Sequence, residues 1–409
     1  MYTFHKFFFR FLQILVRPWF ALTGRYRYKK YRPAYGVSLI LTNHTTNWDF
    51  LYFGAALRGH TYFVGSEHIF RLGFLSKVIR FLVDPIARKK AASSGETVAE
   101  IKRRLAMGRN VCMMAEGNRS FTGQTGFISP ATAELVKSSG AALITYRIHG
   151  GYFVSPRWSV KARKGPVWGE VAGQYSPEEL ARMTDKEVQA IIERDLFVDA
   201  FADQKEKMYR YKAKAPAETL ETALFACPDC GCFACLRSHG DRLVCEQCGS
   251  THIFTEYGFF TRPDGSAPAF ETVFEWTEWQ KTHLGAHLQK SLEEASIDDV
   301  EPGVIREDKG ARLFLVHPLE GKILQCEGTL RLFTDRLEIE PGEVPADAPV
   351  AWDAYSFELH KVSRMAVILV NTILFTAGED YYEIRLPERA NALHYLIAYY
   401  DLNGKEYKR

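Results

Sequence analysis

Short apolar runs that stop abruptly at polar residues characterise the first half of the chain. Leu39 to Leu41 are apolar without alternation, as is typical of a strand covered on both faces, and polar residues begin at Thr42. Val111 to Ala115 has the same pattern and is followed by Glu116 and Gly117. Segments of helical periodicity separate such runs, and this order predicts an α/β domain with a mainly parallel sheet flanked by helices.

A histidine and a carboxylate follow the first of these strands. His44 lies in the expected turn, and Asp49 lies near the start of a helix expected from Trp48 to Leu57. Residues five apart on one helix are about 140° apart around its axis, so only a turn at His44 lets the two side chains meet. A carboxylate bound to one ring nitrogen leaves the other available as a general base. With 12 histidines in the chain such a pair also arises by chance, so it indicates little alone.

A second polar stretch, Glu116-Gly117-Asn118-Arg119-Ser120, follows the other strand. Ligands bind at the carboxyl ends of strands in open α/β sheets, so both stretches are expected to face one site. The guanidinium of Arg119 suits phosphate, although a surface ion pair with Glu116 is the alternative. Glu116 itself could accept a hydrogen bond from a substrate hydroxyl or hold Arg119 in place.

Together these stretches resemble the motifs of the glycerolipid acyltransferase family, typified by 1-acyl-glycerol-3-phosphate acyltransferases. Asn43-His44-Thr45-Thr46-Asn47-Trp48-Asp49 resembles the Asn-His-x-x-x-x-Asp motif, and Glu116 to Ser120 resembles Glu-Gly-Thr-Arg-Ser with Asn118 in place of Thr. Pro85-Ile86-Ala87-Arg88-Lys89-Lys90 is similar to the middle motif, whose phosphate-binding arginine corresponds to Arg88. The fourth motif matches weakly, because Leu143 to Gly150 lacks the usual proline. The resemblance covers roughly residues 1 to 200.

The resemblance implies an O-acyltransferase in which His44, oriented by Asp49, takes a proton from the hydroxyl of a lysophospholipid. The expected acceptor is 1-acyl-glycerol-3-phosphate, which would give phosphatidic acid, and the expected donor is acyl-CoA or acyl carrier protein. The residues expected to bind the substrate phosphate are Arg88, Glu116, Gly117 and Arg119. The alternative from another class is a non-catalytic, membrane-associated lipid-binding scaffold. It would recruit partners through the second half of the chain, which is expected to contain a zinc ribbon, predicted below from cysteine spacing, and a C-terminal domain.

The first 34 residues form a basic, amphipathic segment. Between Phe4 and Phe20 the polar residues are spaced by four, three and four, on one stripe of a helix; they are Lys6, Arg10, Gln13 and Arg17. The apolar run is too interrupted to span a bilayer, so we expect an interfacial helix with its wide apolar face among acyl chains and its basic stripe at anionic headgroups. A signal peptide and a helix packed on the domain are the alternatives. The chain has a net charge of +3 with no acidic residue before Asp49. We expect a peripheral protein on the cytoplasmic face of the membrane and no nucleic acid partner.

Cysteine spacing predicts a metal site in the second half. Cys227-Pro-Asp-Cys230-Gly and Cys245-Glu-Gln-Cys248-Gly are two C-x-x-C-G knuckles, the spacing of a zinc ribbon with a structural Zn²⁺. Cys232 and Cys235 form a third pair, so the ligand set is not unique, and a redox dithiol is the alternative. A structural zinc site is typical of a reducing, cytoplasmic compartment.

A chain of 409 residues is expected to form several domains. The last unit contains alternating strand patterns before one helix and resembles a pleckstrin-homology-like fold. The predicted divisions are a membrane-interface segment (1–34), an acyltransferase domain (35–202), a linker (203–225), a zinc ribbon (226–256), a connecting strand and helix (257–300) and a β-rich domain with a terminal helix (305–409).

Overall fold

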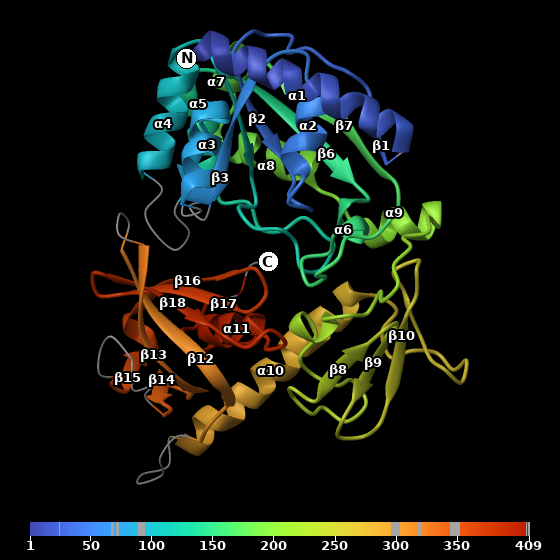
Figure 1. Ribbon diagram of the computed structural model, residues 1–409, viewed down its shortest axis with the longest axis vertical. Helices are drawn as coiled ribbons and strands as arrows, with labels where there is room; N and C mark the ends of the chain where they lie inside the picture. The colour runs from blue at the N-terminus through green and yellow to red at the C-terminus, as the bar shows by residue number, and fades with distance from the viewer. Residues whose placement is uncertain are drawn as a thin grey trace.

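The computed structural model describes residues 1–23, 25–66, 69–70, 73–88, 95–295, 303–317, 321–343, 352–405 and 407. Within these residues the chain forms three sheets, each with its own helices (Figure 1). Lys89 and Lys90 of the middle motif lie outside the described residues.

The first unit carries the motifs and contains one seven-stranded sheet. Its elements are α1 (Tyr2–Thr23), β1 (Tyr26–Tyr28), β2 (Ser38–Thr42), α2 (Asp49–Ala56), β3 (Thr61–Ser66), α3 (Phe74–Val83), β4 (Ile86–Arg88), α4 (Gly95–Ala106), β5 (Asn110–Met114), α5 (Ala131–Ser139), β6 (Ala142–His149), α6 (Gly151–Val154), β7 (Val167–Tyr175), α7 (Pro177–Arg182), α8 (Asp185–Leu196) and α9 (Ala200–Lys207). The strand order is β1-β7-β6-β2-β5-β3-β4, and the pairs are parallel except for β6 with β7. The predicted mainly parallel sheet is therefore confirmed.

The position of β2 explains its unbroken apolar sequence. It lies between β5 and β6, and every residue from Ser38 to Thr42 is buried. Leu39 and Leu41 join the core under α4, α5 and α8, whereas Ile40 joins the core under α1 and α2. Because both faces are covered, the residues between Ser38 and Thr42 are all apolar.

The second and third units follow. The second contains η2 (Leu220–Thr222), β8 (Leu236–His239), β9 (Arg242–Cys245), β10 (Thr251–Phe254), β11 (Phe260–Thr261) and α10 (Val273–Ala295). The third contains β12 (Arg306–His317), β13 (Gly321–Leu332), β14 (Arg336–Pro341), β15 (Tyr355–Glu358), η3 (Leu359–Lys361), β16 (Val362–Ile368), β17 (Thr372–Ala377), β18 (Asp380–Arg385) and α11 (Ala392–Leu402). Its strands form one antiparallel sheet in the order β15-β14-β13-β12-β18-β17-β16, and α11 follows the last strand in the chain. This arrangement agrees with the predicted β-rich unit and its terminal helix.

One hydrophobic core joins these two units to the first. It extends from the C-terminal sheet and α11 through α10 and the cysteine-containing unit to Phe121, Tyr152 and Trp158 of the first unit. Leu220 and Leu224, in the segment predicted as a linker, are fully buried in this core. A hydrogen bond from the Asn391 amide to the Glu221 carbonyl, at 2.9 Å, is one of the polar links between η2 and the start of α11.

Helix α1 packs against α2 and α3, and part of its polar stripe faces α2, whereas Lys6 and Arg10 of the same stripe are exposed. The Gln13 amide donates to the carbonyls of Gly54 and Leu57, both at 2.8 Å, and the Arg17 guanidinium donates to Ala55 and Leu57, both at 2.9 Å. The expectation that the whole polar stripe faces headgroups is therefore wrong, because these two residues satisfy carbonyls at the C-terminal end of α2.

The opposite side of α1 is apolar and exposed. Its exposed side chains include Phe7, Phe11, Ile14, Leu15, Trp19 and Leu22, and Phe74, Leu75 and Phe81 of the neighbouring α3 are exposed as well. Among the described helices, none is both long enough and apolar enough to span a bilayer.

Candidate active site and cysteine cluster

The end of β2 is held in place by Asn43. Its side-chain amide donates to the Ile148 carbonyl at 2.9 Å, and its side-chain oxygen accepts from the Ile148 backbone N–H at 2.8 Å. This pair continues the contact of β2 with β6 beyond the last residue of the strand, which leaves the next residue, His44, at a defined position above the sheet.

His44 and Asp49 meet across the turn that precedes α2. His44 Nδ1 lies 2.8 Å from Asp49 Oδ2, and the Asp49 side chain is fully buried while that of His44 is 22% exposed. The helix begins at Asp49 with Trp48 at its N-cap, one residue after the expected start. The turn thus brings together two side chains that a continuous helix would keep apart.

Thr45 and Thr46 orient the Asp49 carboxylate. Their backbone N–H groups donate to it at 2.7 and 3.0 Å, and their hydroxyls donate at 3.2 and 2.8 Å. Both threonines therefore bind the carboxylate through their backbone and their side chain. A carboxylate held in this way can fix the tautomer and orientation of the His44 ring.

Glu116 holds the backbone of His44 and not Arg119. Its two carboxylate oxygens accept from the backbone N–H groups of His44 and Gly126, each at 2.6 Å. Ser120 adds a second link to the turn, since its N–H donates to the His44 carbonyl at 3.2 Å. Burial raises the pKa of Glu116 to about 8, even though the two backbone N–H bonds act in the opposite direction. The loop after β5 is therefore tied to the histidine by two bonds.

Arg88 and Arg119 approach the same loop from different elements. Arg88 ends β4 and lies against Gly117, where a Cβ atom would be only 2.8 Å from the guanidinium carbon. Arg119 donates to the Ser155 carbonyl at 3.4 Å. Burial lowers the pKa of both arginines, and for Arg119 the negative charge of Asp49 partly offsets this effect.

Neither arginine has a carboxylate partner among the described residues. The surface ion pair between Arg119 and Glu116, the alternative reading of the sequence, is therefore absent there. Two half-buried guanidinium groups without a counter-ion favour an anion, and phosphate matches the geometry of their N–H donors.

The site thus lies at the carboxyl ends of three strands of one sheet. His44 follows β2, Glu116 and Arg119 follow β5, and Arg88 ends β4. A histidine paired with a carboxylate can remove a proton from a hydroxyl, and the two guanidinium groups can hold an anion attached to the same molecule. Sequence reasoning did not identify Arg157, whose Nη1 donates to the Arg119 carbonyl at 3.2 Å.

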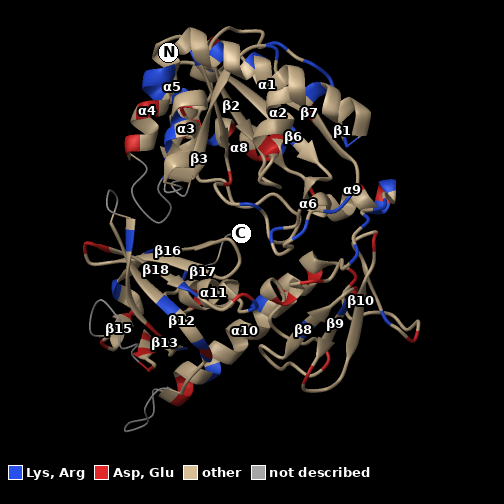
Figure 2. Cartoon of the chain, viewed as in Figure 1, with Lys and Arg blue, Asp and Glu red and all other residues tan. Residues whose placement is uncertain are grey.

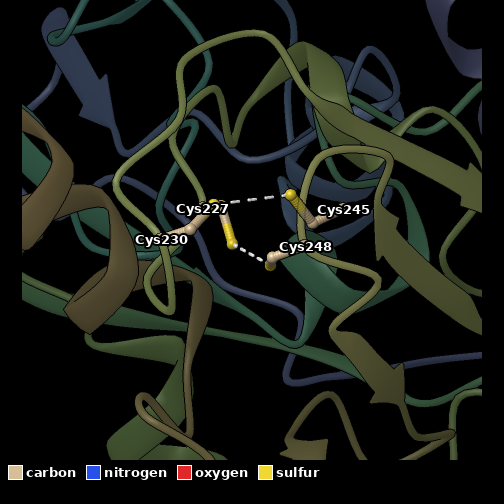
Figure 3. A group of neighbouring side chains, drawn as sticks. All are labelled: Cys227, Cys230, Cys245 and Cys248. Carbon is tan, nitrogen blue, oxygen red and sulfur yellow. Dashed lines mark hydrogen bonds between the residues drawn. The ribbon is translucent and has the colours of Figure 1, made fainter.

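The four cysteines of the two knuckles form one cluster (Figure 3). Their sulfur atoms all lie within 4.8 Å of one another, with Cys227 3.8 Å from Cys248 and Cys230 3.7 Å from Cys245. Two thiolates about 2.3 Å from a tetrahedral zinc are about 3.8 Å apart, so the donor set fits the metal. Cys232 and Cys235, the third pair in the sequence, are bonded to each other and are not part of the cluster.

The two knuckles are built alike. The backbone N–H of Gly231 donates to the Cys227 carbonyl and that of Gly249 donates to the Cys245 carbonyl, both at 2.9 Å. Both glycines have positive φ, at 73° and 74°, a conformation that suits glycine and lets each turn present two thiols to one point.

Comparison with known proteins finds a similarity within the first unit. The family model described as Acyltransferase matches residues 25–149. None of the curated proteins matches the chain. Among solved structures, the 1-acyl-sn-glycerophosphate acyltransferase of Thermotoga maritima is 15% identical, with a TM-score of 0.38, over 50% of this chain and 81% of that chain. A chain of the 8S snRNP assembly intermediate is 15% identical, with a TM-score of 0.17, over 26% of this chain and 85% of that one.

TM-scores of this size do not establish a shared fold, so the family match rests on the sequence of residues 25–149. That range contains His44, Asp49, Arg88 and Arg119. Over residues 25–149 the first unit of this chain is similar to the Acyltransferase family.

Proposed function

We propose that the chain transfers a fatty acyl group from a thioester donor to the hydroxyl of a lysophospholipid, with 1-acyl-glycerol-3-phosphate as acceptor and phosphatidic acid as product. The observation that carries this proposal is the pairing of His44 with Asp49 beside Arg88 and Arg119, two guanidinium groups without a carboxylate partner in the described chain. A base and two guanidinium groups at the carboxyl ends of strands of one sheet suit an acceptor that carries both a hydroxyl and a phosphate.

In this mechanism the acceptor hydroxyl is the nucleophile. Nε2 of His44 takes its proton as the hydroxyl oxygen attacks the thioester carbonyl, and Asp49 stabilises the imidazolium through Nδ1–H. Collapse of the tetrahedral intermediate breaks the carbon–sulfur bond, and the imidazolium returns the proton to the leaving thiolate. The products are the ester and the free thiol of coenzyme A or acyl carrier protein.

The two arginines would position the acceptor relative to His44. Arg88 and Arg119 hold the phosphate, which fixes the distance from the acceptor hydroxyl to His44, and such orientation contributes much of the rate in a reaction between two bound molecules. Gly117 leaves the space that the Arg88 guanidinium occupies. Glu116 acts by holding the His44 and Gly126 backbone rather than by contacting phosphate.

The exposed apolar side of α1 and α3 supports attachment to a membrane, where a lysophospholipid is found. Phe7, Ile14 and Leu22 are 72%, 62% and 88% exposed, which leaves a large apolar surface uncovered. Figure 2 shows basic residues along α1 and the segment after it, where anionic headgroups would lie. We place this surface at the cytoplasmic leaflet.

The cysteine cluster supports a structural zinc ion. Cys227, Cys230, Cys245 and Cys248 would hold it, and a tetrahedral site filled by four thiolates crosslinks two turns without an open position for substrate.

The test is a panel of acceptors and donors with the product read by mass spectrometry. The acceptors are 1-acyl-glycerol-3-phosphate, other lysophospholipids, glycerol 3-phosphate and an ornithine lipid, each with acyl-CoA and with acyl carrier protein. The proposal expects phosphatidic acid from the first acceptor with at least one donor. No acylated product from any combination would instead favour the lipid-binding scaffold.

A further inference from the structure

Arg157 connects the loop that carries Arg119 to the C-terminal sheet. Its Nη1 donates to the Arg119 carbonyl at 3.2 Å, its Nη2 to the Val367 carbonyl at 2.6 Å and its Nε to the Leu369 carbonyl at 2.9 Å. Val367 lies in β16, and Leu369 lies in the turn between β16 and β17. A single guanidinium therefore joins residues that are more than 200 positions apart in the sequence.

The segment around Arg157 holds Arg119 at two points. The Ser155 carbonyl accepts from the Arg119 side chain, and the Arg157 side chain donates to the Arg119 carbonyl. Both the backbone and the guanidinium of Arg119 are thus bound by residues 155–157. A movement of this segment would change the position of the guanidinium relative to His44.

Arg157 is buried in an environment that fixes its position. It is 7% exposed, and its guanidinium lies 3.9 Å above the centre of the Phe121 ring. Burial lowers the pKa of Arg157 to about 9. Among the described residues its acceptors are backbone carbonyls, and such hydrogen bonds to a buried guanidinium are costly to lose.

A cavity of about 180 Å³ lies where the loop after β5 meets the C-terminal unit, and it is lined by Arg119 and Phe127 on one side and by Met365 of β16 and Leu396 of α11 on the other. Beside it, Phe121 of the same loop packs in the core shared with the C-terminal unit. Arg157 adds to this apolar contact a polar link that reaches the Arg119 backbone itself.

We propose that Arg157 is a positioning residue through which the C-terminal unit places Arg119, so that affinity for a phosphate-bearing acceptor depends on the β16–β17 turn. This inference rests on the proposed role of Arg119 as a phosphate-binding residue. It gives the C-terminal unit a part in the acceptor site through the position of Arg119.

The test weakens the hydrogen bonds between Arg157 and the β16–β17 turn, once at the donor and once at the acceptor, in the whole chain. R157M removes all guanidinium donors while keeping an unbranched side chain. L369P acts on the acceptor side, because Leu369 has a φ of 52°, which proline cannot adopt. L369G is the matched control, since glycine tolerates this φ and the Leu369 side chain is 63% exposed.

The measurement is calorimetric binding of a soluble short-chain 1-acyl-glycerol-3-phosphate, compared with the matching monoacylglycerol that lacks phosphate. R157M and L369P are expected to weaken binding of the phosphate compound by about 10-fold or more. L369G should stay within about twofold, and the phosphate-free compound should bind all variants alike. In acyl transfer, KM for the phosphate-bearing acceptor should rise more than kcat falls.

Folded R157M and L369P with unchanged binding would overturn the proposal, as would equal losses for both compounds, which indicate a general structural role. If R157M does not fold, R157K replaces it in the same binding measurement. Lysine keeps the charge but lacks the planar set of donors that reaches three carbonyls, so R157K is expected to weaken binding of the phosphate compound selectively, and unchanged binding would overturn the proposal. If the wild type transfers no acyl group yet R157M selectively weakens phosphate binding, the proposed function fails while this inference stands.

Discussion

Gly117 lies directly against the guanidinium of Arg88, and a Cβ atom at this position would be 2.8 Å from the guanidinium carbon. Its φ is 70°, which a residue with a side chain rarely adopts. Both the backbone conformation and the position of Arg88 therefore favour glycine where β5 leads into the candidate site.

Gly117→Ala is expected to displace Arg88 and to raise KM for the phosphate-bearing acceptor by about 10-fold or more, as loss of a charged hydrogen bond would. Steady-state kinetics measure this effect. Gly108→Ala is the control, because its φ is 72° but no atom lies within 4 Å of the added Cβ. The two variants share the backbone strain, so an equal effect on KM would show that crowding of Arg88 is not the cause.

The exposed face of α1 makes a prediction about membrane binding. Replacing Phe7, Ile14 and Leu22 together by serine should lower the partition onto anionic vesicles by about 100-fold or more, since burying each such side chain contributes about 1.5–3 kcal/mol. Flotation with vesicles measures the partition. The control replaces Val304 and Ile323, which are exposed on the C-terminal unit, and should leave binding unchanged. Equal loss in both proteins would contradict the assignment of the lipid surface to α1.

The cysteine cluster predicts about one zinc per chain, measured by elemental analysis. Cys227→Ser should lower this content and the thermal midpoint, because a bound metal would crosslink the two turns. Cys326→Ala, which changes a buried cysteine of β13, is the control and should keep the zinc. Zinc content that is independent of Cys227 would contradict the assignment.

The raised pKa of Glu116 predicts that the stability of the protein depends on pH. Its pKa is raised from 4.5 to about 8, so the folded protein binds its proton more tightly than the unfolded chain does. The contribution of Glu116 to the free energy of unfolding is therefore fully present below about pH 4.5 and is lost as the pH rises towards 8. The difference in free energy of unfolding between wild type and Glu116→Gln, measured by denaturant titration, should fall across this range. A difference that stays constant with pH would show that Glu116 ionises normally.

Local sequence predicted the parts of the site that depend on strand ends. The unbroken apolar run Leu39 to Leu41 predicted the buried strand, and its abrupt end predicted the turn that brings His44 to Asp49. The paired knuckles likewise predicted the four-cysteine cluster, because each turn closes through its own backbone.

What the sequence did not predict depends on contacts between distant segments. Gln13 and Arg17 have the pattern of a solvent-facing stripe, yet the docking of α1 on the C-terminal end of α2 turns them inwards. Arg157 has no local motif, and its contacts with Val367 and Leu369 exist only because the C-terminal unit packs on the first. Both cases need the tertiary arrangement of carbonyl groups, which periodicity does not contain.

The most direct test of the mechanism is the rate at which His44→Ala forms phosphatidic acid from 1-acyl-glycerol-3-phosphate and a thioester donor. His149→Gln is the matched control, since His149 also pairs with a carboxylate, Asp203, at 2.6 Å. We expect His44→Ala to lower the rate by about 10³-fold or more, with vesicle binding intact and His149→Gln near wild type. A His44→Ala protein that retains the wild-type rate would contradict the account.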